Sequence, residues 1–138
     1  MDAEALQAFL AQPHDAIIST NRMGKGSQLS PVWFVWDGES FLFGTQKASV
    51  KYVNIVRDPN ISVIVSDPVT HTYVTAYGRA EIVELERYPE LGNTIVEKYI
   101  PADQRQQFEA SNQAIERASR VVIMLKPEKV VGWAWTAL

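Results

Sequence analysis

The feature that most constrains this chain is a series of short, apolar, β-rich runs, each bounded by residues that favour turns. Asp37-Gly38 is the clearest of these turns, because Asp-Gly between two apolar runs is a strong hairpin signal. The runs lie at Ala16–Thr20, Gln28–Trp36, Phe41–Thr45, Ile61–Ser66, Thr72–Leu85, Val121–Leu125 and Lys129–Trp135. Antiparallel hairpins in about this number predict a small closed barrel, because closure removes exposed strand edges.

Short helices are predicted on the connections between these strands. Asp2 is placed to cap a first helix that ends at Ala11, with Leu6, Phe9 and Leu10 as its apolar stripe. Two further helices are predicted over Tyr88–Tyr99 and Asp103–Arg117, and the second of them is polar. With 138 residues and no linker or repeat, we expect residues 1–138 to form one mainly β (α+β) domain.

Composition excludes several classes of partner. The net charge of −3 argues against a general nucleic-acid surface or an anionic-membrane surface. The chain has no cysteine, so disulfides and thiolate metal sites are excluded. No apolar run is long enough for a membrane helix, and the start Met1-Asp2-Ala3-Glu4 lacks the basic residues of a signal peptide. We therefore expect a cytoplasmic protein without nucleic-acid or membrane partners.

The segment from Thr45 to Pro59 predicts a strand end, a tight turn and a short helix. Ser49 is placed as the N-cap of that helix, and Asp58-Pro59 is placed to end it. Val50, Val53, Ile55 and Val56 recur near helical spacing and predict its apolar stripe. Lys47 and Lys51 flank the helix start, where free amides and the dipole favour an anion such as a phosphate. The alternative is a capped surface helix with ordinary solvated lysines.

Other candidate positions carry weaker signals. Pro31 cannot donate to a strand ladder, so an edge or a bulge is expected there, where a flat ligand could bind main chain. The alternative is a proline that only protects a strand edge. Trp133 and Trp135 share one side of the last strand and predict either a ring-binding wall or packing. His14 and His71 lie far apart with no acidic partner at the spacing of metal ligands, so we expect neither a metal site nor a catalytic residue of the usual constellations. If the chain is an enzyme, a bound cofactor supplies the chemistry.

The sequence resembles the pyridoxamine 5′-phosphate oxidase-like superfamily, and most of all its short flavin- or deazaflavin (coenzyme F420)-dependent oxidoreductases. The resemblance extends over nearly the whole chain, and the block Ser49–Pro59 is its most specific part. It is carried by Ile17–Thr20, Gln28–Phe34, Phe41–Thr45, Lys47–Asn60, Ile61–Val65, Tyr77–Ala80, Arg120–Ile123 and Val131–Trp133. The chain is shorter than true pyridoxamine phosphate oxidases and lacks their C-terminal Arg-x-His, so oxidation of vitamin B6 is not expected.

The resemblance implies a six-stranded antiparallel split β-barrel that forms a homodimer, with two cofactors in clefts between the subunits. It places the cofactor phosphate at Ser49 and Lys51, with Thr45, Gln46 and Lys47 beside them. It places the isoalloxazine or deazaflavin ring against four residues of the preceding strand, which are Ser30, Pro31, Val32 and Trp33. The late strands of the partner subunit close the cleft, with Trp133 and Trp135 as their candidates.

Three functions are consistent with these observations. The first is an oxidoreductase that uses F420 to transfer hydride to an unsaturated small organic acceptor, with a proton from water or a hydroxyl such as that of Tyr77. The second keeps FMN in the same cleft, because both cofactors carry a phosphate and a tricyclic ring. Arg22, Lys25 and Lys47 are candidates for a basic groove that would favour the longer, polyanionic F420 tail. The third is a non-catalytic flavin- or haem-binding protein. The acceptor pocket is expected on the loops 67–72 and 101–112.

Overall fold

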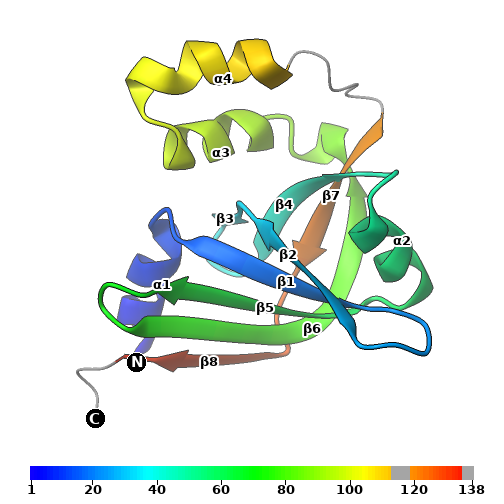
Figure 1. Ribbon diagram of the computed structural model, residues 1–138. Coiled ribbons are helices and arrows are strands. Elements are labelled where there is room, and N and C mark those ends of the chain that lie inside the picture. The colour runs from blue at the N-terminus through cyan, green and yellow to red at the C-terminus, as the bar shows by residue number, and fades with distance from the viewer. Residues whose placement is uncertain (113–118, 135–138) are drawn as a thin grey trace.

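The computed structural model describes residues 1–112 and 119–134, without the side chains of residues 109–112 (Figure 1). Its centre is an antiparallel sheet, curled into a half-barrel, whose hydrogen-bonded order is β2-β1-β5-β6-β7-β4-β3, with β8 paired to β6. The strands are β1 (Asp15–Asn21), β2 (Ser27–Val32), β3 (Val35–Trp36), β4 (Phe41–Gln46), β5 (Asn60–Asp67), β6 (Thr72–Glu84), β7 (Arg120–Leu125) and β8 (Lys129–Trp133). The predicted mainly β fold, a split barrel with short helices, is confirmed, and the described sheet has 8 strands instead of six.

The run Gln28–Trp36 was expected to be one strand, and this expectation is wrong. The chain leaves the sheet at Trp33 and Phe34, so that β2 and β3 form separate strands. Phe34 is 1% exposed, and its amide donates to the Tyr99 hydroxyl at 3.4 Å instead of to a neighbouring strand. This break also explains why the barrel is split instead of closed. β2 and β3 are the two ends of the strand order, and no ladder joins them in the described residues.

The long strand β6 changes partners at Gly78, where sequence analysis predicts a bulge or a bend. Residues from Tyr73 to Tyr77 pair with both β5 and β8, Gly78 and Arg79 pair with β5 alone, and residues from Ala80 on pair with β7. A Cβ at Gly78 would lie 3.0 Å from the Leu125 side chain and 3.2 Å from the Glu128 amide. A glycine therefore lets the β7–β8 connection cross closely over the bend.

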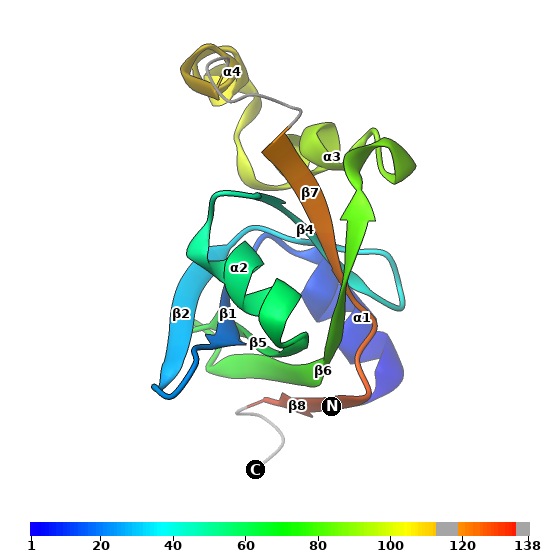
Figure 2. The ribbon, with the colours of Figure 1, turned by 90° about the vertical axis from the view of Figure 1, so that its right-hand side faces the viewer.

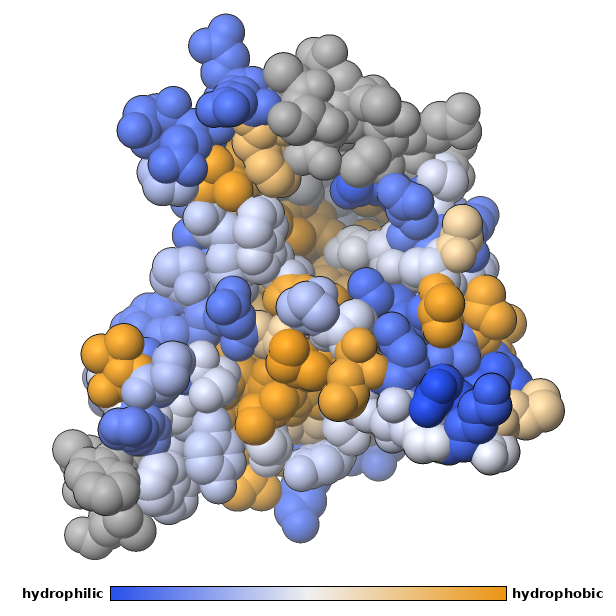
Figure 3. All heavy atoms as spheres, viewed as in Figure 1, coloured by the Kyte–Doolittle hydropathy of each residue, from blue (hydrophilic) through white to orange (hydrophobic). Residues whose placement is uncertain are grey.

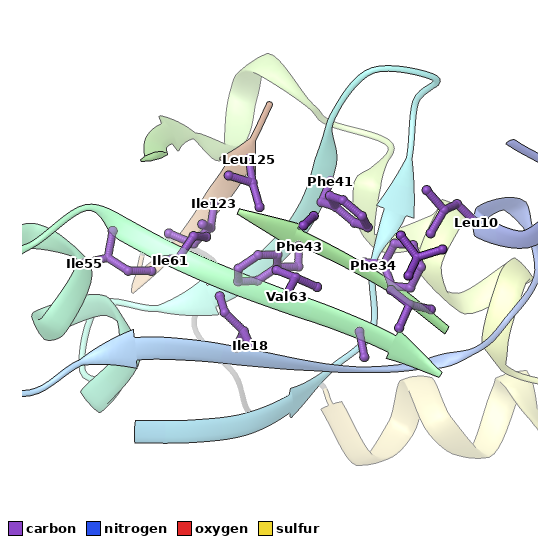
Figure 4. Close-up of a cluster of buried hydrophobic side chains, with 14 of the residues drawn as sticks. Leu10, Ile18, Phe34, Phe41, Phe43, Ile55, Ile61, Val63, Ile123 and Leu125 are labelled. Carbon is purple, nitrogen blue, oxygen red and sulfur yellow. The ribbon is translucent and has the colours of Figure 1, made fainter. Parts of the chain in front are cut away.

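Helices close the two ends of the barrel. α1 (Ala3–Ala11) is capped by Asp2 as predicted, with the Asp2 carboxylate accepting from the Ala5 amide at 2.7 Å. α2 (Val50–Arg57) lies at the opposite end (Figures 1 and 2). Between them lies the main core, and Figure 4 shows Leu10 of α1 at one side of this cluster and Ile55 of α2 at the other. Apolar burial of this kind is the main stabilising term of the fold.

The outer side of β4 and β7 is covered by the segment that connects β6 to β7. This segment contains 3-10 turns at Leu85–Arg87 and Ala102–Gln104, and the helices α3 (Leu91–Tyr99) and α4 (Arg105–Asn112). A second core cluster of Leu42, Val83, Leu91 and Val122 joins it to the sheet. The predicted helix Tyr88–Tyr99 begins later, at Leu91, and residues 113–117 of the predicted second helix lie outside the described residues. No helix in the described ranges has the length and apolarity to cross a membrane.

Candidate functional site

The turn that leads into α2 is held by side-chain hydrogen bonds. The Ser49 hydroxyl accepts from the Tyr52 amide at 3.2 Å and lies 2.8 Å from the hydroxyl of Thr45, which is 7% exposed. The Ser49 amide donates to the Gln46 carbonyl at 3.0 Å. The predicted cap at Ser49 and the predicted helix end at Asp58 are therefore confirmed.

Replacing Ser49 with alanine is expected to lower the free energy of unfolding by about 1 kcal/mol, because the helix loses its cap. The buried Thr45 hydroxyl would also lose the Ser49 hydroxyl as its hydrogen-bond partner. Urea denaturation of the variant against Ser27→Ala, which removes an exposed hydroxyl at the start of β2, measures this effect. Equal unfolding free energies for the two variants would show that the cap does not stabilise the chain.

The electrostatics of this helix start favour a bound anion. No acidic residue lies in its first turn. The amides of Val50 and Lys51 precede the first intrahelical hydrogen bond, so they can donate to a ligand. Lys51 is half-buried and makes no hydrogen bond or ion pair to any part of the chain that the structure describes, and burial lowers its pKa. A half-buried ammonium without a carboxylate gains from an anionic partner.

Lys47 stands at the same turn and is exposed. Its backbone amide donates to the Ser119 carbonyl at 2.8 Å, which joins the turn to the residue before β7. The two lysines and the free amides thus form an arrangement with the donors that a phosphate requires.

The far end of α2 is anchored by a polar network that sequence analysis missed. Asn54 is 4% exposed and donates to the Thr20 hydroxyl of β1 at 3.1 Å. Arg57 donates to the Asn54 side chain at 3.1 Å and to the Asn21 carbonyl. The only available signal was a polar residue among the apolar positions of the helix. This network fixes the direction of the helix, and hence the place of its N-terminus.

The predicted apolar stripe of α2 is wrong in part. Ile55 is buried, at 2% exposure, whereas Val50, Val53 and Val56 are 58%, 53% and 59% exposed. The helix therefore turns Asn54 and Ile55 toward the barrel and three valines outward. The side of α2 that faces the barrel is fixed by the hydrogen bond from Asn54 to Thr20, which lies 34 residues earlier in the chain.

The predicted ring-binding strand forms one lip of the split in the barrel. Ser30, Pro31 and Val32 lie on β2, which pairs only with β1 among the described strands. Ser30 faces the interior opposite Ile18, and its hydroxyl is the one buried side-chain polar atom without a hydrogen-bond partner in the described residues. Pro31 is exposed. The free edge of β2 can therefore offer backbone groups to a ligand, while the Ser30 hydroxyl points inward.

The other lip is the second half of β4. β3 pairs with β4 only at Phe41 and Leu42, so no described strand covers the same edge from Phe43 to Gln46. Thr45 and Gln46 lie on this uncovered part, immediately before the helix start. Figure 2 shows α2 below β4 and beside β2. The candidate phosphate residues are thus next to one lip of the split.

Two predicted tryptophans have intramolecular partners. Trp33 is 37% exposed and stacks on Tyr99 of α3, with ring centroids 5.1 Å apart and planes 8° apart. Trp133 stacks on Tyr73 across β6 and β8 at 5.6 Å, and this end of β8 lies away from α2 in Figure 1. Within one chain Trp133 is therefore not placed beside Lys51. Trp135 lies outside the described residues.

The histidines have local roles. A ring nitrogen of His14 lies 3.0 Å from the Gln12 side-chain oxygen, and its ring stacks on Phe9 at 4.3 Å. Burial is the largest influence on His14 and lowers its pKa. His71 is exposed in the β5–β6 turn, with a φ of 54°. Among the described residues, no group of three or more His, Asp or Glu could hold a metal ion.

Comparison with known proteins gives a consistent result. A family model described as pyridoxamine 5′-phosphate oxidase matches residues 3–134. A conserved hypothetical protein from Mycobacterium tuberculosis is 24% identical with a TM-score of 0.77, covering 97% of this chain and 85% of that one. A structure described as an F420 reductase is 26% identical with a TM-score of 0.68, covering 91% of this chain and 94% of that one. A haem-binding protein from Mycobacterium smegmatis is 18% identical with a TM-score of 0.70, covering 95% of this chain and 53% of that one. No curated protein sequence matches significantly.

Proposed function

The chain belongs to the pyridoxamine 5′-phosphate oxidase family, and we propose that it is an oxidoreductase that uses coenzyme F420 to reduce an unsaturated small organic acceptor. The observation that carries this proposal is the helix start at Ser49–Lys51. Among the described residues, it combines free amides, a first helical turn without an acidic residue, and a half-buried ammonium without a hydrogen bond or ion pair, beside one lip of the split barrel. A phosphate-bearing cofactor matches that set of donors.

The residues of this chain would hold and orient the cofactor. The α2 amides and Lys51 would bind its phosphate, and the β2 edge at Ser30–Trp33 would contact its ring. When bound in its reduced form, F420 would supply the hydride that the acceptor receives, and the cofactor would be left oxidised. The proton is proposed to come from water or from a hydroxyl such as that of Tyr77, which is 44% exposed.

F420 is preferred to FMN because a structure described as an F420 reductase is similar over nearly its whole length. FMN remains the second candidate, because the phosphate donors would serve either cofactor. Haem is less favoured. The haem-binding relative is below 25% identity and supports the fold alone. His14 also packs on Phe9 and lies within hydrogen-bonding distance of Gln12, so it is not presented as an axial ligand.

Absorbance of the protein purified from a host that makes both cofactors tests the proposal. A deazaflavin spectrum that is bleached by reduction and restored by an acceptor is the expected result. A flavin spectrum would replace F420 by FMN. A colourless protein that takes up neither cofactor on titration would contradict the proposal.

We further propose a homodimer with the outer face of the sheet as its interface. The cross-strand register aligns Ile17, Ile64, Thr75 and Val131 in one row over β1, β5, β6 and β8. Ile64 and Val131 are 38% and 41% exposed, and Figure 3 shows hydrophobic side chains gathered at the centre of this face. An exposed apolar row of this kind is typical of an interaction surface. A second subunit would bring its own Trp133 toward the cleft.

Sedimentation at micromolar concentration is expected to give about twice the chain mass of 15.5 kDa. Ile64→Lys is expected to shift the protein toward monomer, because it places a charge in the apolar row. Glu81→Lys, on the exposed part of β6 that pairs with β7, is the control and should leave the mass unchanged. A monomeric wild type that binds cofactor tightly would contradict the interface.

A further inference from the structure

Three valines form an exposed apolar stripe along α2, and neither the phosphate site nor the proposed dimer interface accounts for it. Val50, Val53 and Val56 are spaced three residues apart, so they share one side of the helix. Their exposed fractions are 58%, 53% and 59%, whereas Asn54 and Ile55 are buried on the side that faces the barrel. An apolar helix side left in solvent is typical of an interaction surface.

The tip of the β1–β2 hairpin extends this apolar surface. Met23 lies in the turn between β1 and β2 and is 75% exposed. The turn is tied to the far end of α2, because Arg57 donates to the Asn21 carbonyl and the Asn21 side chain donates to the Asp58 carboxylate at 3.0 Å. Figures 1 and 2 both show the turn beside α2 at one convex end of the molecule. We call this surface the α2 end, and it consists of residues 22–26 and 47–58.

Positive charge is concentrated at the α2 end. It holds five of the 13 lysines and arginines and one of the 16 acidic residues, which leaves +4 in a chain of net charge −3. The cations are Arg22, Lys25, Lys47, Lys51 and Arg57. The one acid, Asp58, accepts hydrogen bonds from the side chains of Asn21 and Asn60. The net charge, which argues against an anionic membrane, therefore averages this basic end with an acidic remainder.

Charged and apolar side chains alternate closely on this surface. At the right-hand side of Figure 3, over α2 and the hairpin turn, hydrophobic side chains lie next to strongly hydrophilic ones. Lys25 and Lys47 are exposed and make no hydrogen bond or ion pair within the part of the chain that the structure describes. Their ammonium groups can therefore bind an external anion without breaking a contact of the fold.

An apolar stripe bordered by cations matches an anionic lipid surface. Apolar side chains enter the boundary between headgroups and acyl chains, while lysines and arginines bind the lipid phosphates. A second copy of the chain fits less well, because a twofold contact would place +4 against +4. We propose that the α2 end docks the protein on anionic membranes, with the valine stripe toward the lipid. The contact is peripheral, because α2 has 8 residues and a spanning helix needs about 20.

Co-sedimentation of the full chain with vesicles tests this docking. The protein is expected to bind vesicles of equal parts phosphatidylserine and phosphatidylcholine, to bind pure phosphatidylcholine much less, and to be released by salt. Val53→Glu should weaken binding about tenfold, because it places a carboxylate in the middle of the stripe. Val69→Glu is the matched control, since Val69 is 86% exposed in the β5–β6 turn, at the other end of the molecule in Figure 1. It should bind as wild type does.

A second pair of variants tests the charge. Lys25→Ala is expected to weaken binding about fivefold, because each lysine near an anionic surface contributes roughly that factor. Lys126→Ala, which removes an exposed lysine outside the α2 end, should leave binding unchanged. All four replaced residues lie outside the proposed cofactor-binding residues, so the result does not depend on the proposed function. Far-UV circular dichroism should be the same for all variants, because each replaced side chain is exposed.

Four outcomes would overturn the docking. The first is a wild type that stays in solution with the mixed vesicles. The second is equal binding by Val53→Glu and Val69→Glu. The third is vesicle binding that inorganic phosphate abolishes and Val53→Glu leaves intact, which would assign the lipid contact to the phosphate site at the helix start. The fourth is a dimeric wild type that Val53→Glu converts to monomer, which would assign the stripe to a second copy.

Discussion

Replacing Lys51 with alanine is expected to weaken binding of F420 or FMN roughly tenfold to a hundredfold. The variant loses the half-buried ammonium at the start of α2, which has no carboxylate partner among the described residues. Charge-assisted hydrogen bonds contribute about 1.5–3 kcal/mol, which corresponds to that range of affinity. Ser49→Ala should cost less affinity, because it removes a cap and no charge. Titration of the apoprotein measures both effects.

Analogues without the phosphate make this test specific. Wild type should prefer the phosphorylated cofactors, and Lys51→Ala should lose most of that preference. Lys126→Ala is the control, because this lysine is exposed and only 4.0 Å from the Glu39 carboxylate in a surface ion pair. Arg57 is a poor control, since its bonds to Asn54 and Asn21 hold α2 in place. If Lys51→Ala still discriminates as wild type does, the phosphate site lies elsewhere.

The pH dependence of cofactor affinity follows from the same ammonium. Burial lowers the pKa of Lys51, so in the free protein it loses its proton at a lower pH than an ordinary lysine. Since the phosphate binds the charged form, affinity should be full below that pKa and should decline as the pH rises through it. Lys51→Arg is expected to keep its affinity to higher pH, because a guanidinium stays charged. Parallel declines in the two proteins would exclude Lys51 as the titrating group.

The parts of the site that could be predicted from sequence depend on local chemistry. Asp2, Ser49 and Asp58 were placed correctly because caps and helix ends are set by residues within one turn of each other. Gly78 was recognised as a bend because glycine in a long strand marks a close approach. The phosphate donors follow from the cap, since a helix start brings its amides and its flanking lysines together by geometry alone.

The parts that could not be predicted depend on distant partners. The sequence around Trp33 and Phe34 predicts a continuous strand. In the structure, Tyr99, which lies 65 residues after Phe34, accepts a hydrogen bond from the Phe34 amide and stacks on Trp33. The orientation of α2 likewise depends on a distant partner, because the Asn54 side chain donates a hydrogen bond to the Thr20 hydroxyl. Such choices are made by tertiary contacts, which override the local pattern. The three outward valines of α2 show the same limit, because their spacing alone cannot tell which side of the helix is buried.

Replacing Phe34 with alanine is expected to lower the free energy of unfolding by about 3–5 kcal/mol, the usual range for a buried phenylalanine. Phe34 is 1% exposed, and its ring lies 5.4 Å from that of Phe41 and 6.5 Å from that of Tyr99. The Lys98 ammonium lies over the same ring at 3.8 Å. Burial lowers the pKa of Lys98 to about 8, because it disfavours the charged ammonium. The contact with the Phe34 ring and the hydrogen bonds to two backbone carbonyls offset part of that desolvation cost. The variant removes the ring and leaves the ammonium beside a cavity.

Trp33→Ala is the informative comparison, because the two aromatic residues are adjacent and are 37% and 1% exposed. The Trp33→Ala variant loses ring stacking worth about 0.5–1.5 kcal/mol per pair and the contacts of a partly exposed side chain. It should therefore lower the free energy of unfolding clearly less than Phe34→Ala. Phe34→Leu should fall between the two, since it refills part of the cavity. Urea denaturation followed by circular dichroism gives all three values. Equal losses for Trp33→Ala and Phe34→Ala would mean that the strand break does not turn Phe34 into the core, because burial is what separates the two positions.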